Sequence, residues 1–201
     1  GGFSPPSEII VVTSATPGGD YTLGADRIGI VSEPGVTMGG GDSGGAVISA
    51  EERYFLWVEA QIDAASDNFG VGMVSGTSNF AVLRGVTVDG CVHTGIHVSS
   101  INARLVDITV TNSGWEGLQA TGWYSVVRNV TATGNRAGIN YQAGQEVLIE
   151  DITTGGNSSD GLRTGVSHSI IRNVVAYDNG QHGIDGASDN LMYGIVVQNT
   201  G

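Results

Sequence analysis

The chain of 201 residues contains no lysine, one cysteine and four prolines. Against 20 acidic residues stand only eight arginines, so the net charge is −12 and no basic patch exists to neutralise nucleic acid phosphates. Cys91 cannot form an internal disulfide, and no spacing of Cys and His typical of a metal site occurs. The sequence also lacks an apolar run of the roughly 18 residues that a membrane span requires. We therefore expect neither nucleic acid binding nor membrane insertion, and no protein metal site.

Glycine, by contrast, is abundant, with 33 residues, which is roughly twice the usual share. The glycines lack the three-residue period of collagen, so we expect them at many turns. Hydrophobic residues make up 40% of the chain, which is typical of a folded protein rather than a disordered one. The length predicts a single domain over residues 1–201.

A repeat of about 22 residues dominates the second half of the chain. A glycine followed by an aliphatic residue recurs at Gly72, Gly95, Gly117, Gly138, Gly161 and Gly183. A second column carries a residue that tolerates left-handed backbone, at Gly85, Asp107, Asn129, Asp151, Asn173 and Gly194. A third column, expected at turns, holds Asn112, Asn135, Asn157 and Asn179. The three columns stay in phase, which indicates one structural unit per repeat.

Each repeat reads as three short strands, for example 137–141, 146–150 and 152–154, with a corner at Asp151. Three strands in about 22 residues describe one coil of a solenoid. The sequence therefore predicts an all-β fold, a single-stranded right-handed parallel β-helix of about nine coils, in a rod ~40 Å long. We expect irregular coils over 1–70 and regular ones over 71–201, with the chain forming part of a longer protein or an assembly.

Several segments resemble known β-helix families. Segments 17–23 (PGGDYTL), 27–31 (RIGIV) and 35–38 (GVTM) resemble the opening coils of the pectin-lyase-like superfamily. Segments 77–80 (TSNF) and 83–90 (LRGVTVDG) resemble mannuronan C5-epimerases, as do 173–180 (NVVAYDNG) and 182–184 (HGI). The resemblance implies a polysaccharide as partner and lyase, epimerase or hydrolase chemistry. The Asp-Pro-His motif of the epimerases is absent, and without lysine there is no lysine base.

Strand alternation places one polar column on the outside of the first strand of each coil. We expect it to form a shallow groove that binds substrate, with aromatic and amide neighbours supplying sugar contacts. The predicted binding residues are His97, Trp115, Glu116, Gln119, Trp123, Asn140 and Tyr141. The densest ionisable cluster, and hence the predicted catalytic set, is Asp160, Arg163, His182 and Asp185.

Two kinds of chemistry suit this cluster. Paired carboxylates, Asp160 and Asp185, suit acid–base hydrolysis of a glycoside. Elimination or C5 epimerisation of a uronate would instead use Arg163 to neutralise charge, His182 as base and a tyrosine as proton donor, from Tyr124 or Tyr141. The charge of −12 opposes an acidic glycan unless calcium bridges the two, so calcium is the cofactor to consider. Whether the chain catalyses any reaction stays open at this level.

The remaining faces favour other interpretations. Arg128, Glu150 and Arg172 form an outward ladder of alternating charge, expected to contribute little because such pairs are exposed. Threonines at 87, 109, 131 and 153 form an array like those that bind ice, although threonine is also an ordinary strand residue.

We expect an extracellular polysaccharide-binding or polysaccharide-modifying protein. The alternative is a structural or adhesive rod at a cell or virion surface, with homo-oligomers or end-to-end stacking of coils.

Overall fold

The computed structural model describes residues 8–13, 21–22, 27–34, 36–39, 46–49, 55–64, 67–72, 80–186 and 189–201. Among these residues all regular structure is β-strand, and no helix is long and apolar enough to cross a membrane. Parts of the region expected to be irregular, including 1–7, 17–20 and 51–53, lie outside the described residues, as do residues 77–79 of the segment 77–80 that resembles epimerases.

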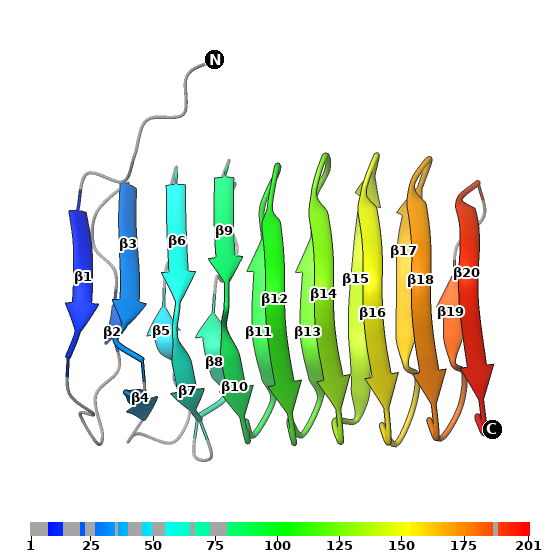
Figure 1. Cartoon of the computed structure of the whole chain (residues 1–201), viewed down its shortest axis with the longest axis horizontal. Helices are drawn as coiled ribbons and strands as arrows, with labels where there is room; N and C mark the ends of the chain where they lie inside the picture. Colours follow the sequence, from blue (N-terminus) through cyan, green and yellow to red (C-terminus); the bar gives the residue numbers. More distant parts are fainter. Residues whose placement is uncertain are drawn as a thin grey trace.

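The strands form two parallel sheets, one in front of the other in Figure 1, that both extend along the rod. The main stack of sheet A comprises β1 (Glu8–Val12), β3 (Arg27–Ser32), β6 (Phe55–Glu59), β9 (Phe80–Arg84), β12 (Arg104–Thr111), β14 (Val126–Thr133), β16 (Leu148–Gly155), β18 (Ile170–Tyr177) and β20 (Leu191–Gln198). Three short strands, β4 (Thr37–Gly39), β7 (Gln61–Asp63) and β10 (Thr87–Asp89), extend its lower edge.

Sheet B lies behind sheet A in Figure 1 and stacks in the same chain order. It comprises β2 (Tyr21–Thr22), β5 (Ala46–Ser49), β8 (Phe69–Gly72), β11 (Thr94–Ser99), β13 (Glu116–Thr121), β15 (Ala137–Gln145), β17 (Leu162–Ser167) and β19 (Ile184–Gly186). Strands pair in parallel with their neighbours one coil before and after, for example β12 with β9 and β14. This pairing confirms the predicted parallel solenoid.

The predicted corner column is a row of left-handed residues in the middle of the long sheet A strands. Its backbone φ angles lie between 51° and 66°, at Gly85, Asp107, Asn129, Asp151, Asn173 and Gly194. Asparagine, aspartate and glycine tolerate this region, which explains the composition of the column. The second and third predicted strands are therefore two legs of one bent strand, as in β16 around Asp151.

The estimate of nine coils is slightly too high, because the described rod has about 7 turns. The later coils do follow the predicted period, since Arg104 pairs with Val126 and Val126 pairs with Leu148. Two of the earlier coils take more chain, because Arg27 pairs with Phe55 and Phe55 pairs with Phe80, whereas the first step, from Glu8 to Ile28, is shorter than the regular period. Dividing the whole length by the regular period therefore overcounts the turns.

The interior is filled by aliphatic side chains stacked from coil to coil. In sheet B the column Ile96, Leu118, Ile139 and Leu162 is fully buried and in register. The repeated glycines permit the close approach of successive coils. A Cβ added at Gly138 would lie 2.4 Å from the carbonyl oxygen of Gly161, a distance that real contacts do not allow. The glycine column is thus a packing requirement of the fold.

One turn column runs inside the rod as a polar ladder. The buried side chains of Asn135, Asn157 and Asn179 each accept a hydrogen bond from a backbone N–H one coil earlier, at 2.8, 3.0 and 3.3 Å. The first of these donors is Ser113, whereas Asn112 is exposed and donates to Asp89. The sequence placed Asn112 in the ladder, but the step from Asn112 to Asn135 is longer than the later steps, which puts Ser113 there instead.

Candidate functional site

The predicted polar column lies in register across five neighbouring strands of sheet B. Its residues are His97 in β11, Gln119 in β13, Asn140 in β15, Arg163 in β17 and Asp185 in β19. Parallel pairing brings each position beside its equivalent one coil on, about 4.8 Å away. Alternation along each strand points the column outward, since the preceding aliphatic residue faces the core.

Two adjoining cavities follow this column. The first, of about 290 Å³, is lined by Trp115, Glu116, Arg136, Ala137, Asn140, Ser159, Asp160, Arg163 and Gln181. The second, of about 390 Å³, is lined by Asn140, Gln142, Arg163, Thr164, Gly165 and Asp185. Asn140 and Arg163 line both cavities. We call the two together the sheet B groove.

The four predicted catalytic residues form one cluster beside the groove, although His182 lines neither groove cavity and instead lines a hollow with Gly183 and Met192. Asp160 is buried, with 2% of its side chain exposed, and its Oδ2 lies 3.4 Å from a terminal nitrogen of Arg163. The Nε of Arg163 lies 3.4 Å from Oδ2 of Asp185. On the other oxygen of Asp160, the Nδ1 of His182 approaches to 2.9 Å and the backbone N–H of His182 donates at 3.2 Å. The cluster is therefore a continuous network centred on a buried carboxylate.

The same cluster brings three possible metal ligands together, which the sequence did not predict. One atom each from Asp160, His182 and Asp185 lies within 4.8 Å of the others. Arg163, however, contacts both carboxylates and already neutralises their charge. A cation would have to displace the guanidinium, so we describe the cluster as an ion-pair network and assign no metal to it.

Glu116 is held in place from both neighbouring coils. The hydroxyl of Thr94 donates to its Oε2 at 3.0 Å, and the amide of Asn140 donates to its Oε1 at 3.4 Å. Asn140 is itself buried. The two residues therefore form a fixed part of the groove lining, with hydrogen-bonding positions set before any ligand arrives.

Two side chains lie close to the ring of Trp115, which the sequence predicts to stack on sugars, while 48% of the residue is exposed. The ring of His93, from the coil before, lies 5.5 Å away between centroids with a tilt of 32°. The guanidinium of Arg136, from the coil after, lies 5.0 Å from the centre of the indole. Trp115 lines the first cavity, and its role in sugar stacking stays a prediction.

Two predicted contact residues lie elsewhere. Tyr141 is fully buried and its hydroxyl donates to the carbonyl of Gly122 at 3.0 Å, so it cannot touch a ligand in the groove. Alternation explains this, because Tyr141 shares the inward side of β15 with Ile139. Trp123 is 52% exposed but follows the far end of β13, roughly 25 Å along the strand direction from Trp115. It lines neither groove cavity.

His97 and Gln119 extend the polar column beyond the two cavities. Both side chains are half-buried, and the ring of His97 lies 5.9 Å from that of Phe69. Burial lowers the pKa of His97, although the negative charge of Glu116 opposes the shift. The imidazole of His97 is therefore neutral at pH 7 and acts as a polar but uncharged surface.

Sequence reasoning missed several lining residues. Arg136, Ser159 and Gln181 form one wall, where the hydroxyl of Ser159 donates to Gln181 at 3.0 Å. Gln142 lines the second cavity because the pairing of β15 shifts after Tyr141. The sequence does contain a sign of this bulge, because Gly138 follows Gly117 by one residue fewer than the 22-residue repeat. Bulges of this kind recur beside functional sites.

The fold and the groove define a right-handed β-helix protein. The model of the family described as "Right handed beta helix region" matches residues 69–200, well over half of the chain, so the chain belongs to this family. Among solved structures it is similar to the "Azotobacter vinelandii Mannuronan C-5 epimerase AlgE4 A-module" at 15% identity and a TM-score of 0.39, covering 98% of this chain and 67% of that one. No activity follows from a likeness at that level. No curated protein matches the sequence.

Proposed function

We propose that this protein binds a polysaccharide along the sheet B groove. The observation that carries the proposal is the pair of adjoining cavities that share Asn140 and Arg163 and follow an in-register polar column. A glycan chain is an extended polymer with hydroxyl groups at regular intervals. A groove that repeats amide, carboxylate and guanidinium groups from coil to coil suits such a ligand.

Recognition in this groove rests on hydrogen bonds rather than on ring stacking. Trp115 already has His93 and Arg136 beside its ring, whereas Arg163, Asn140 and Gln142 line the cavities with donors and acceptors. Glu116 and Asp160 are already fixed by their neighbours, which lowers the entropy lost on binding. We expect moderate affinity per sugar and a contact that extends over several residues of the glycan.

The negative charge of the chain affects which glycans it is expected to bind and where the protein is expected to be found. With a net charge of −12, a neutral glycan is expected to bind without help, and an acidic one only with calcium as a bridge. An acidic surface without lysine also suits an extracellular protein, and we include that location in the proposal. The binding experiment described next is therefore performed with and without calcium.

Isothermal titration calorimetry of the full chain against neutral and uronic polysaccharides, with and without calcium, tests the proposal. Arg163→Gln removes a group that lines both cavities and should weaken binding at least about tenfold, the loss of one charged hydrogen bond. Arg84→Gln is the matched control, because Arg84 is exposed on sheet A with a loose 3.9 Å partner in Asp107. Equal losses in both variants, or no binding to any glycan, contradict the proposal. The second result combined with long polymers in light scattering would favour the structural rod.

A further inference from the structure

We propose that His182 is a general base, positioned by Asp160, that hydrolyses ester groups carried by a glycan in the groove. The inference rests on the proposed glycan binding and adds a reaction to it. The substrate class is an O-acyl ester of a polysaccharide, and water is the co-reactant. His182 would be the catalytic residue, and Asp160 would act through it as a positioning residue.

The hydrogen bonds of Asp160 determine which nitrogen of His182 carries the proton. An ionised carboxylate only accepts hydrogen bonds, so the Nδ1 that lies 2.9 Å from Oδ1 must be the protonated nitrogen in the neutral ring. The backbone N–H of the same histidine donates to the same oxygen at 3.2 Å, which fixes the ring relative to the carboxylate. The lone pair of Nε2 is then free to accept a proton.

Burial differs sharply across this pair. Asp160 has 2% of its side chain exposed, while His182 has 65% exposed. Among the described residues none makes a hydrogen bond to Nε2 of His182. A buried anion therefore orients an exposed imidazole through Nδ1, the arrangement that supports histidine as a base in hydrolases.

The carboxylates themselves are poorly suited to be the acid of a glycosidase. Atoms of Asp160 and Asp185 lie within 4.8 Å of each other, close to the ~5–5.5 Å between the carboxyl groups of retaining enzymes. Arg163, however, lies 3.4 Å from an oxygen of each, so both carboxylates are engaged by the guanidinium. The Nε2 of His182, by contrast, has no hydrogen-bond partner among the described residues.

Solvent exposure also favours an ester over a C–H bond as the target. Removing a proton from carbon is difficult in open water, and enzymes that do so exclude solvent from the base. His182 is exposed, so water is both present and the natural nucleophile. Ester hydrolysis assisted by an imidazole base needs no other reagent.

The proposed reaction balances with water alone. The oxygen of water bonds to the acyl carbon while its proton moves to Nε2 of His182. The oxyanion that develops lies beside the Arg163 guanidinium, which lies in the same network. The intermediate then breaks its bond to the sugar oxygen, and the imidazolium returns the proton to that oxygen. The products are a carboxylic acid and a free sugar hydroxyl, and Asp160 stays ionised throughout.

The tautomer of His182 is testable without any glycan. In ¹⁵N-labelled full-length protein at neutral pH, NMR shifts should show Nδ1 protonated and Nε2 unprotonated. Asp160→Asn removes the charge at almost constant shape and should shift the ring toward the Nε2–H form. A wild-type ring protonated mainly on Nε2 would overturn the proposal.

The reaction is tested with p-nitrophenyl acetate and with acetate release from O-acetylated xylan. We expect His182→Gln to lower the rate on the glycan about 100-fold, the lower range for loss of a general base. Asp160→Asn should lower kcat with KM unchanged. His168→Asn is the matched control, since His168 is exposed, remote from the network and at φ 51°, which asparagine tolerates.

The two proposals fail in different ways. If His182→Gln hydrolyses both esters as fast as wild type, the catalytic inference is wrong, while glycan binding measured by calorimetry still decides the proposed function. If the wild type cleaves p-nitrophenyl acetate through His182 but binds no glycan, the base is real and the glycan ligand is wrong. A wild type no faster than His182→Gln on either ester overturns the inference.

Discussion

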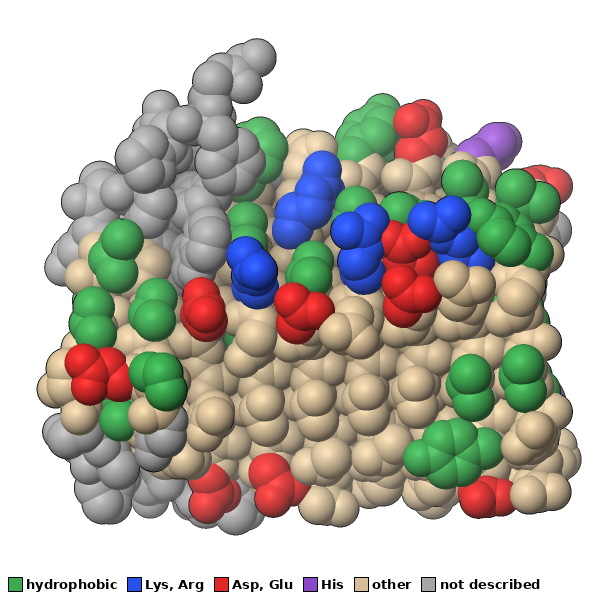
Figure 2. Space-filling view, viewed as in Figure 1, with side chains coloured by type: hydrophobic (Ala, Val, Ile, Leu, Met, Phe, Trp, Pro, Cys, Tyr) green, Lys and Arg blue, Asp and Glu red, His purple; other side chains and the backbone are tan. Residues whose placement is uncertain are grey.

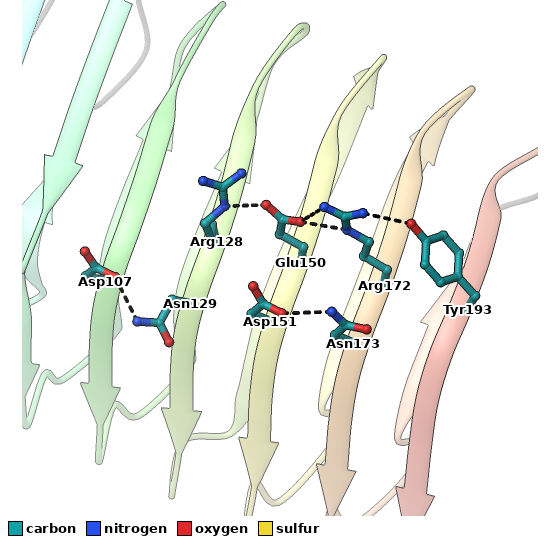
Figure 3. A network of polar contacts seen from close by, with 8 residues as sticks. All are labelled: Asp107, Arg128, Asn129, Glu150, Asp151, Arg172, Asn173 and Tyr193. Atoms are coloured by element: carbon teal, nitrogen blue, oxygen red, sulfur yellow. Dashed lines mark hydrogen bonds and ion pairs between the residues drawn. The ribbon is translucent and has the colours of Figure 1, made fainter.

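The protein carries two outward ladders of charged side chains, one on each sheet. They differ in how many of their polar groups already have a partner within the protein. On sheet A, Glu150 accepts from Arg128 on one side and from Arg172 on the other, and Arg172 donates to the Tyr193 hydroxyl at 3.0 Å (Figure 3). On sheet B, Arg163 links Asp160 to Asp185 beside two cavities. Both ladders repeat at coil spacing, yet only the second adjoins the groove.

The sheet A ladder corrects an expectation. The sequence predicted an exposed charge ladder of little value, but Glu150 is 3% exposed and lies between two arginines. Figure 2 shows this face with arginine and acidic side chains mixed in one band rather than gathered around a hollow. A saturated ladder of this kind stabilises the wall. The sheet B network instead leaves Nε2 of His182 free, which is why we assign the chemistry there.

The largest expected effect comes from a change that disrupts the coil spacing on which both ladders depend. Gly138→Ala would place a methyl group 2.4 Å from the Gly161 carbonyl oxygen. Overpacking of this kind costs about 1–3 kcal/mol and occasionally more. Urea denaturation should show the loss, with glycan affinity reduced as well. The same substitution at Gly156, where a Cβ meets nothing within 4 Å but φ is +61°, should cost less, about 1 kcal/mol. Equal losses at both positions would contradict the packing argument.

Glu150→Gln separates the structural ladder from the groove. The variant leaves two arginines facing one another without the buried anion, and we expect a loss of about 1–3 kcal/mol in unfolding free energy. Glycan affinity should not change. Asp151→Asn is the control, because Asp151 is exposed at the corner where asparagine occurs in other coils, and it should shift stability by less than about 0.5 kcal/mol. Unchanged stability in Glu150→Gln would show that the ladder contributes nothing.

The acid sensitivity of the wall follows from the same carboxylate. Burial alone would raise the pKa of Glu150, but hydrogen bonds and charge from Arg172 and Arg128 outweigh it and lower the pKa. A lowered pKa in the folded state contributes stability above the unfolded value, about 4.3, and that stability is lost as pH falls through the folded pKa. Thermal unfolding from pH 7 to pH 3 should show wild type and Glu150→Gln converging at the acid end. A constant difference would contradict this assignment.

Asp185→Asn is expected to change stability less than Glu150→Gln, and it tests the corresponding charge ladder on sheet B. The side chain of Asp185 is 48% exposed and its pair with Arg163 is at the surface, so unfolding free energy should change by at most about 1 kcal/mol. Because Asp185 lines the second cavity, glycan affinity should fall measurably in calorimetry. A variant that loses stability but keeps its affinity would make this ladder structural, like the one on sheet A.

The sequence predicted the outward polar column of the candidate site, but not how the side chains around that column are arranged. Asn140, Arg163 and Asp185 follow from the period, because each is the residue after an inward aliphatic in a parallel coil. Tyr141 was misassigned although alternation places it inward with Ile139. Trp115 lines the first cavity, but the approach of His93 and Arg136 to its ring depends on side-chain directions in turns. The bulge at Gln142 was visible only as a small irregularity in the spacing of the glycine column.

The sequence by itself determined the parallel β-helix, its coil length and the column that each strand residue joins. The reason is that in-register parallel stacking turns a separation of one period along the chain directly into spatial contact. Only the tertiary structure decided that Glu150 is buried, that Arg136 lies over the ring of Trp115 and that Asp160 holds Nδ1 of His182. These features depend on side-chain directions at turns and on the packing of neighbouring coils, which a period does not specify.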